Sequence, residues 1–206
     1  MIMSSCLCLF ATAILAIAVS KPLPHETRAN LVNYHPEIVD TKNASLLPAA
    51  ANPCGFVLYK QCDSQWGSEP LGTSSTNTIC SAGCAMSSTS MVVSTWNGKT
   101  SSWNPGSLNT WLNSHNGYVQ TDLIVWSAVD SLHADFVRET HIAEDYLIAQ
   151  VTNCSNAFIA NVRSGSHWVL LTGYAGSGNF YVNDPGFSTT EYAYSGMGDI
   201  VQYFDH

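Results

Sequence analysis

Apolar residues recur at helical spacing near the middle of the chain. Three apolar residues and a threonine follow one another at positions i, i+4, i+7 and i+11: Ala85, Thr89, Val92 and Trp96. This spacing predicts a helix that begins near residues 81–84 and ends before Asn97. The helix therefore starts close to a cysteine, Cys84.

Three further helices are predicted from capping residues and short apolar stripes. The first begins at Asn104-Pro105, a cap followed by a favourable first-turn proline, and Asn116 stops it. A short helix covers residues 128–132, with Ser127 as its cap. The last covers residues 143–151, where two acidic residues in the first turn complement the helix dipole.

The pattern changes after residue 151, where short β-branched and aromatic runs replace the helical spacing. Three such runs, punctuated by glycines, predict three strands: residues 157–162, 168–174 and 179–182. Helices followed by antiparallel strands indicate an α+β fold rather than a doubly wound sheet.

The first residues explain part of the hydrophobic content. Residues 6–19 form an uninterrupted apolar run, too short for a membrane-spanning helix of about 20 residues, and small residues follow at a cleavage-like position. We interpret residues 1–20 as a removed secretion signal, so no stable membrane anchor is expected. The proline-containing residues 21–53 predict a linker or a pro-segment, and residues 54–206 predict one domain.

Charge is scarce throughout the chain. Only 11% of residues are charged and the formal net charge is −8. The seven basic residues are scattered, which excludes the clustered Lys and Arg that nucleic-acid binding requires. Lys60 is the only basic residue between Lys42 and Lys99. A surface rich in hydroxyl and amide groups favours a secreted, extracellular or vacuolar protein.

Secretion changes the cysteine count. Five cysteines remain after the signal: Cys54, Cys62, Cys80, Cys84 and Cys154. In an oxidising compartment they predict two disulfides and one remaining thiol. The sequons at Asn43 and Asn153 are candidate glycosylation sites, which is compatible with the same compartment.

Cys84 is a candidate nucleophile. It follows Gly83 at a predicted helix start, where backbone N–H groups and the helix dipole lower the pKa of a thiol. The alternative, that Cys84 is a disulfide partner, remains open on these features alone. A thiolate catalyst also needs a base, a group that orients the base, and donors for the oxyanion.

His167 and Asp184 are the candidates for base and orienting group. His167 begins one predicted strand and Asp184 ends the next, so the two are neighbours across an antiparallel hairpin. Each has an ordinary interpretation, a surface or core histidine and a turn aspartate. Together with Cys84 they fit a Cys-His-Asp triad.

These residues also carry a resemblance. The pattern Gln61-Cys62-Asp63-Ser64-Gln65-Trp66-Gly67, then Gly83-Cys84, then the segment from Ser166-His167 to Tyr174, then Asn183-Asp184-Pro185-Gly186, resembles the peptidase C39-like family. Residues 104–112 also look like a helix of that family. The resemblance spans roughly residues 59–186.

The resemblance implies a papain-like fold and a role for each matching residue. Cys84 matches the nucleophile, His167 the base, Asp184 the residue that orients the base, and Gln61 the oxyanion donor. Because Gln61 and Cys84 would then meet in the site, it also favours the pairs Cys62–Cys80 and Cys54–Cys154. Activation of Cys84 would depend on His167 and the helix N-terminus, since basic residues are sparse around it.

Two other groups of residues are weaker candidates for metal binding. Cys54, Cys62, Cys80 and Cys84 are a weak set of zinc ligands, because only the last two have zinc-site spacing. His133, Asp135 and His141 are a second weak metal candidate in a predicted loop. The tryptophans of the helical half are expected to build its core rather than a carbohydrate platform. We therefore expect no metal and no cofactor.

The sequence as a whole predicts a secreted, monomeric cysteine peptidase that cleaves peptide or protein substrates. One alternative is a peptidoglycan peptide hydrolase or amidase of the same fold. Another is a secreted binding domain that has lost turnover, which a disulfide at Cys84 would support.

Overall fold

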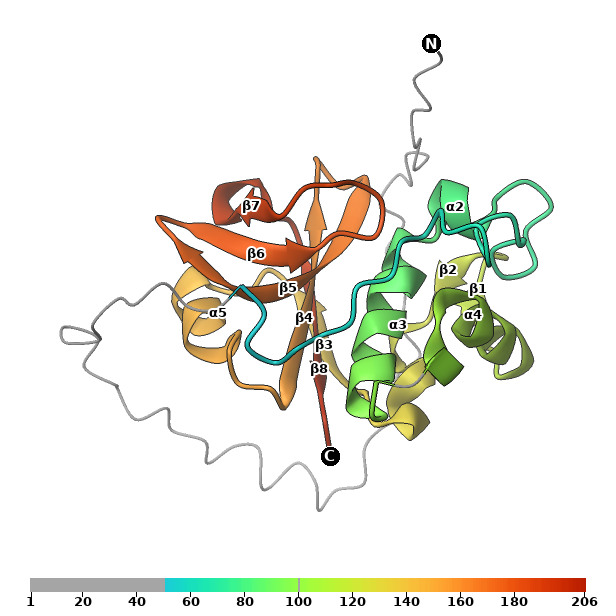
Figure 1. Cartoon of the computed structure of the whole chain (residues 1–206), viewed down its shortest axis with the longest axis horizontal. Helices are drawn as coiled ribbons and strands as arrows, with labels where there is room; N and C mark the ends of the chain where they lie inside the picture. Colours follow the sequence, from blue (N-terminus) through green and yellow to red (C-terminus); the bar gives the residue numbers. More distant parts are fainter. Residues whose placement is uncertain (1–50, 100) are drawn as a thin grey trace, which may run out of the picture. The chain divides into compact units, whose positions relative to one another are not determined.

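A computed structural model describes residues 51–99 and 101–206 (Figure 1). The predicted signal at residues 1–20, the sequon at Asn43 and most of the predicted linker or pro-segment 21–53 lie outside the described residues. In the described part, helices precede an antiparallel sheet, which confirms the predicted α+β fold.

The helical half contains three α-helices: α2 (Ile79–Ala82), α3 (Cys84–Trp96) and α4 (Pro105–Ser114). The long helices α3 and α4 lie where the sequence predicts them. Helix α4 begins as expected, because the Asn104 side chain accepts a hydrogen bond from the Ser107 N–H and Pro105 occupies the first turn. Helix α2 was not predicted. Its signal is a capping box in which Thr78 and Ser81 satisfy each other's backbone N–H groups.

The third predicted helix differs from its prediction. Residues Trp126–Leu132 form a 3₁₀ helix whose N-cap is Val125, so Ser127 is not the cap. The fourth prediction is confirmed as α5 (Glu144–Gln150).

The sheet has six strands rather than the three that were predicted. Its order is β3-β8-β4-β5-β6-β7, and every pair of neighbours is antiparallel. The predicted strands are β4 (Asn156–Val162), β5 (His167–Gly176) and β6 (Asn179–Asn183). Three strands of the sheet were not predicted: β3 (Asp135–Thr140), β7 (Glu191–Ala193) and β8 (Ile200–Phe204). A small hairpin of β1 (Tyr118–Val119) and β2 (Leu123–Ile124) was not predicted either.

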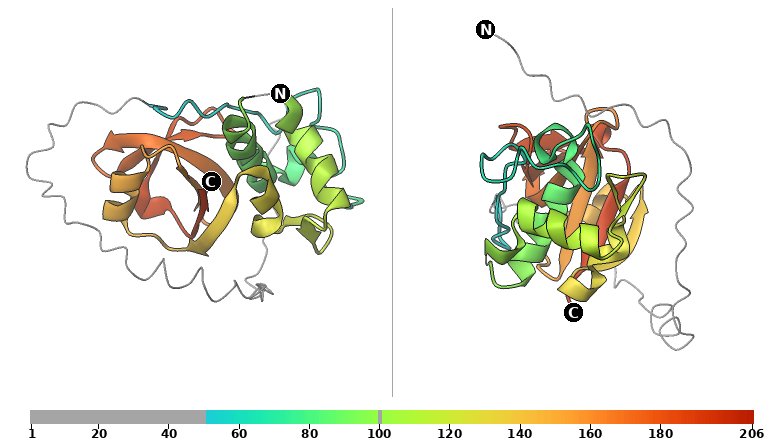
Figure 2. Two further views of the ribbon diagram at one scale, coloured as in Figure 1. Left: turned by 90° about the horizontal axis from the view of Figure 1, so that it is seen from below. Right: turned by 90° about the vertical axis from the view of Figure 1, so that its right-hand side faces the viewer.

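The prediction of a loop around Asp135 was wrong. Strand β3 carries charged residues and alternates weakly, so pairing with β8 decides its structure rather than its own pattern. Register shifts in the β3–β8 and β5–β6 pairs accompany the curvature of the sheet in Figure 2.

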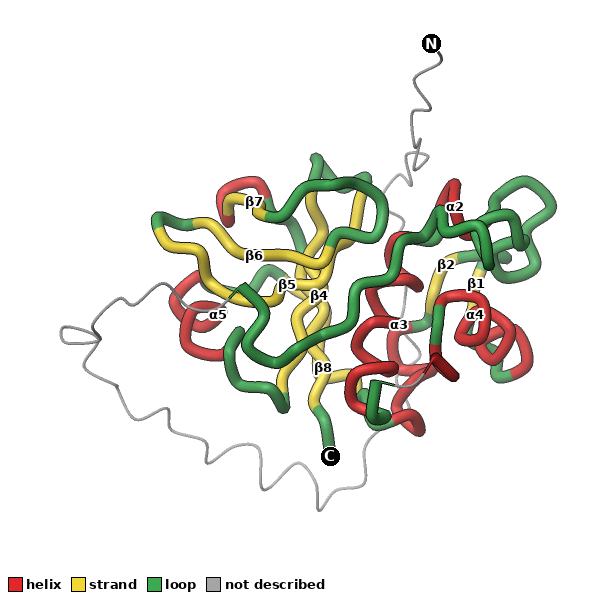
Figure 3. Tube along the Cα trace, in the orientation of Figure 1, coloured by secondary structure: helices red, strands yellow, loops and turns green. Residues whose placement is uncertain are grey.

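Each face of the sheet packs against its own hydrophobic cluster. Ile159, Leu170 and Val201 face the helical half, where they pack in one cluster with residues of α3 and α4. Residues of opposite parity, such as Phe158 and Leu171, pack with α5 on the other face. Figure 3 shows this arrangement, with α3 and α4 on one side of the strands and α5 on the other.

Two disulfides bridge distant parts of the described chain. Cys54 pairs with Cys154 and Cys62 pairs with Cys80, the pairs that the resemblance favoured. A zinc site built from Cys54, Cys62, Cys80 and Cys84 is therefore excluded, because three of these four proposed ligands are oxidised. Among the described residues, no helix has the length and apolar character needed to span a membrane.

Candidate active site

Cys84 is the first residue of α3, directly after the break between α2 and α3. The break depends on Gly83, because a Cβ atom there would lie 2.5 Å from the carbonyl oxygen of Ile79. The first N–H groups of a helix have no partner within the helix and create a positive end. Cys84 lies outside both disulfides, so the structure contradicts its alternative role as a disulfide partner.

His167 and Asp184 meet at one end of the sheet. His167 is the first residue of β5, Asp184 follows the last residue of β6, and Leu170 pairs with Asn183 between them. The His167 Nε2 atom lies 2.7 Å from Asp184 Oδ1. The hairpin therefore brings these two side chains together, and Nδ1 is the ring nitrogen left for a further partner.

The Asp184 carboxylate is surrounded by donors. Its Oδ1 atom accepts hydrogen bonds of 2.8 Å from both Gly186 N and Phe187 N, and its Oδ2 atom accepts one of 3.0 Å from the Tyr192 hydroxyl. Burial alone raises the pKa of this carboxyl, but the hydrogen bond and charge of His167 and the two N–H groups outweigh burial and lower the pKa below its ordinary value. Asp184 is thus held as a carboxylate beside His167.

Helix α3, which begins at Cys84, packs against strand β5, which begins at His167. The Ser88 hydroxyl donates a hydrogen bond of 3.2 Å to the carbonyl of Trp168, the residue after His167. Ser88 lies four residues after Cys84, on the same face of the helix. Cys84, at the start of the helix, therefore lies about 6 Å along the helix axis from the residue that makes this contact.

Gln61 connects the helical half to the His167 side of the site. Its side-chain Nε2 donates to the Cys80 carbonyl at 2.6 Å, and its backbone N–H donates to the Pro185 carbonyl at 2.9 Å. The disulfide between Cys62 and Cys80 fixes the same junction. Gln61 is therefore anchored on both sides, at the α2 segment and at the turn that follows Asp184.

All four candidate side chains are almost completely shielded from solvent. The exposed fractions are 3% for Cys84, 2% for His167, 1% for Asp184 and 0% for Gln61. Electrostatic interactions among them are consequently stronger than on the surface. The structure thus brings the His167–Asp184 pair close to Gln61, and it packs helix α3, which begins at Cys84, against strand β5, which begins at His167.

Some residues of this region were not singled out by the sequence analysis. The Phe187 ring packs edge-on against the His167 ring, with their centroids 5.0 Å apart. Gly186 lies so close to His167 that a Cβ atom would be 2.9 Å from its Cε1. Tyr192 and Lys60 bind the Asp184 turn. The only sequence feature that could have pointed to Gly186, Phe187 and Lys60 is their closeness along the chain to Asp184 or Gln61.

Trp66 and the other tryptophans of the helical half have structural positions. Trp66 is buried, and its indole N–H donates to the Lys60 carbonyl at 2.9 Å. Four further tryptophans pack against the hydrophobic cluster of the helical half: Trp96, Trp103, Trp111 and Trp126.

The second metal candidate does not assemble among the described residues. His141 Nε2 lies 2.8 Å from the Tyr194 hydroxyl, whereas Asp135 pairs with His206 at 3.0 Å. His133 also contacts His206, through its Nδ1 atom 3.2 Å from the His206 carbonyl oxygen, so His141 is engaged apart from the other two residues. In the described ranges, no group of three His, Cys, Asp or Glu residues has the arrangement of a metal site.

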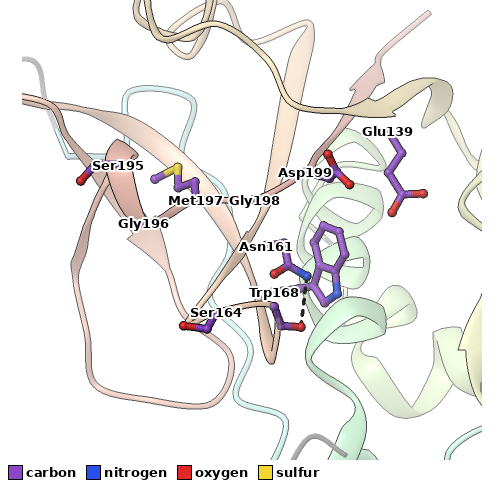
Figure 4. Close-up of a pocket in the computed structure, with 10 residues that line it drawn as sticks. Glu139, Asn161, Ser164, Trp168, Ser195, Gly196, Met197, Gly198 and Asp199 are labelled. Atoms are coloured by element: carbon purple, nitrogen blue, oxygen red, sulfur yellow. Dashed lines mark hydrogen bonds between the residues drawn. The ribbon is translucent and has the colours of Figure 1, made fainter. Parts of the chain in front are cut away.

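Trp168, the residue after His167, lines a pocket of about 510 Å³ (Figure 4). Figure 4 shows the Asp199 and Glu139 side chains near the Trp168 ring, with Asn161 beside it. These residues come from four neighbouring strands or their ends. This pocket was not predicted from the sequence.

Comparison with known proteins places the chain in a family. No curated protein matches the sequence. Among solved structures, the chain is similar to a double glycine motif protease from an AMS/PCAT transporter, solved in complex with its leader peptide. The identity is 14%, the match covers 60% of this chain and 84% of the other, and the TM-score is 0.43. The model of the Peptidase_C39 like family matches residues 55–205, and the chain therefore belongs to that family of cysteine peptidase-like proteins.

Proposed function

We propose that this protein is a cysteine peptidase in which Cys84 is the nucleophile, His167 the general base and Asp184 the residue that orients His167. The observation that carries the proposal is the buried His167–Asp184 hydrogen bond, beside the helix that begins with the one described thiol outside the disulfides. Membership of the C39-like family supports the same reaction class.

The proposed reaction begins with proton transfer from the Cys84 thiol to His167. The thiolate sulfur attacks the substrate carbonyl carbon and forms a tetrahedral intermediate. Its oxyanion accepts hydrogen bonds from the Cys84 backbone N–H and from Gln61. An amide nitrogen carries two N–H groups, so Gln61 can donate to the oxyanion while it holds the Cys80 carbonyl.

Collapse of the intermediate breaks the peptide bond. The imidazolium of His167 gives its proton to the leaving amine, and an acyl-enzyme remains on the Cys84 sulfur. His167 then takes a proton from a water molecule, whose oxygen attacks the thioester carbonyl carbon. The C–S bond breaks, which releases the carboxylic acid product and restores the Cys84 thiolate beside the His167 imidazolium. Asp184, held as a carboxylate by its donors, stabilises the imidazolium during both steps.

The compartment and organisation of the chain belong to this proposal. Two disulfides favour an oxidising environment, and we propose that the protein is secreted after removal of residues 1–20. Residues 21–53 then serve as a linker or pro-segment, and residues 54–206 are the peptidase domain. Asn153, an exposed residue beside disulfide-bonded Cys154, is the described candidate for glycosylation.

The decisive experiment compares cleavage of a peptide library by the wild type and by Cys84→Ala. We expect Cys84→Ala to abolish cleavage, because no other described thiol is outside a disulfide. His167→Ala should lower activity by about 10³-fold or more, since removal of a triad member leaves only binding and oxyanion stabilisation. His115→Ala, which changes an exposed histidine after α4, is the matched control.

Alkylation by iodoacetamide at pH 5.5 provides a second readout. An ordinary thiol is almost fully protonated at this pH and reacts slowly. We expect wild-type Cys84 to react readily and His167→Ala to react much more slowly. Equal cleavage by the wild type and Cys84→Ala would overturn the proposal.

A further inference from the structure

Lys60 makes contacts that its sequence position does not suggest. It lies directly before Gln61, and its Nζ atom donates hydrogen bonds of 2.6 Å to the carbonyl oxygens of both Asp184 and Phe187. These acceptors are 124 and 127 residues away in sequence. In the described part of the chain, no carboxylate forms a salt bridge with this ammonium group.

The turn that Lys60 binds is held from two sides. On one side, Asp184 Oδ1 accepts the N–H groups of Gly186 and Phe187. On the other, the carbonyl groups of Asp184 and Phe187 accept from Lys60, and Pro185 accepts from the Gln61 backbone. An ammonium group with three donors is suited to this double contact.

The same turn forms the surface against which His167 lies. The Phe187 ring contacts the His167 ring edge-on, and Gly186 approaches it closely. A displacement of the Asp184 and Phe187 carbonyls therefore moves both the partner of His167 Nε2 and the packing of its ring. Lys60 therefore contacts the turn beside His167, and the next residue, Gln61, is the proposed oxyanion donor. Because the two residues are consecutive, they fix the position of the proposed base relative to the proposed oxyanion donor.

We propose that Lys60 is a positioning residue for the peptidase reaction, which fixes the Asp184–Phe187 turn and through it the orientation of the His167 imidazole relative to Gln61. The expected kinetic effects rest on the proposed peptidase function. The expected structural effect, a fixed geometry of the His167–Asp184 hydrogen bond, does not depend on that function.

The role of the side chain is separable from folding of the segment. The Lys60 carbonyl independently accepts hydrogen bonds from the Trp66 indole and the Asp63 N–H, and the Gln61 N–H is held by Pro185. A change at the end of the Lys60 side chain leaves these backbone contacts in place. Lys60→Met removes the donors at similar side-chain length, and Lys60→Arg keeps them.

The kinetic test compares these two variants with Lys99→Met, which changes an exposed lysine. We expect Lys60→Met to lower kcat about 10- to 100-fold with KM within about twofold, because misplacement by 1 Å costs up to about 100-fold. Its pH–rate profile should shift on the limb that reports His167. Lys60→Arg should recover most of kcat, and Lys99→Met should match the wild type.

A second readout does not require turnover. The His167 proton bonded to Asp184 should give a downfield ¹H NMR signal in the wild type, Lys60→Arg and Lys99→Met, and this signal should broaden or vanish in Lys60→Met. An unchanged signal, or wild-type kcat and pH profile in Lys60→Met, would overturn the inference. If the wild type cleaves no peptide while the signal behaves as expected, the proposed function fails and the positioning role stands.

Discussion

At the scale of single residues, the site depends on small groups that allow close approach. Gly83 permits the tight turn from α2 into α3, and Gly186 permits the His167 ring to lie against the Asp184 turn. Neither requires positive φ; each is a place where a Cβ atom meets another group. Cys84 and His167, the proposed nucleophile and base, therefore each lie against a glycine.

Gly186→Ala tests this close approach. The added methyl group would lie 2.9 Å from His167 Cε1 and 3.3 Å from Gln61 Oε1, so the ring or the turn must move. We expect kcat to fall about 10- to 100-fold, measured by peptide cleavage under conditions where the protein stays folded.

Gly196→Ala is the matched control for that variant. A Cβ atom at Gly196 meets nothing within 4 Å, so activity should match the wild type. Wild-type kcat in Gly186→Ala would show that the ring tolerates displacement.

At the scale of elements, local signals and tertiary pairing contribute differently. Helices α3 and α4 carry their own periodicity and caps, and they lie where the sequence predicts them. Strand β3 lies at one edge of the sheet and β8 lies between β3 and β4, and neither strand was predicted. In β8, residues of both faces are buried, so alternation is absent, whereas β3 is largely polar. Their structure follows from mutual pairing.

Asn104→Ala tests whether α4 depends on its cap. The Asn104 side chain accepts the Ser107 N–H at 2.9 Å, and loss of such a cap costs about 1 kcal/mol of unfolding free energy. We expect a melting temperature about 2–4 °C lower by calorimetry.

Cleavage by the folded Asn104→Ala variant should be unchanged, since none of the proposed site residues lies on α4. Asn104→Ser retains an acceptor and should restore most of the loss. Equal destabilisation by Ala and Ser would contradict capping as the cause.

At the scale of the molecule, the two disulfides have distinct positions relative to the site. Cys54–Cys154 joins residues 100 apart in sequence, whereas Cys62–Cys80 joins residues 18 apart. The longer loop restricts the unfolded chain more. The shorter one adjoins Gln61 and the carbonyl that Gln61 holds.

Removing each disulfide by a double alanine substitution should therefore separate its effect on stability from its effect on activity. Chain entropy predicts a loss of about 4.7 kcal/mol for Cys54→Ala/Cys154→Ala and about 3 kcal/mol for Cys62→Ala/Cys80→Ala, measured by urea unfolding. We expect the larger loss of kcat in Cys62→Ala/Cys80→Ala, because Gln61 loses an anchor. The reverse order in kcat would argue against a link between this disulfide and Gln61.

The sequence determined much of this protein by itself. Helical spacing and caps located α3 and α4, β-branched and aromatic runs between glycines located β4 to β6, and the ordered motifs pointed to the C39-like family and to the candidate residues. These features are local, or they are fixed in order along the chain, so a single sequence is sufficient to recognise them.

Only the tertiary structure decided the rest. The pairing of β3 with β8, the closeness of Gly186 to His167, and the contact of Lys60 with two carbonyls more than 120 residues away have no local signal. Each arises where chain packing brings distant backbone groups together. Such contacts depend on the three-dimensional path of the chain, which the residue types at those positions do not specify.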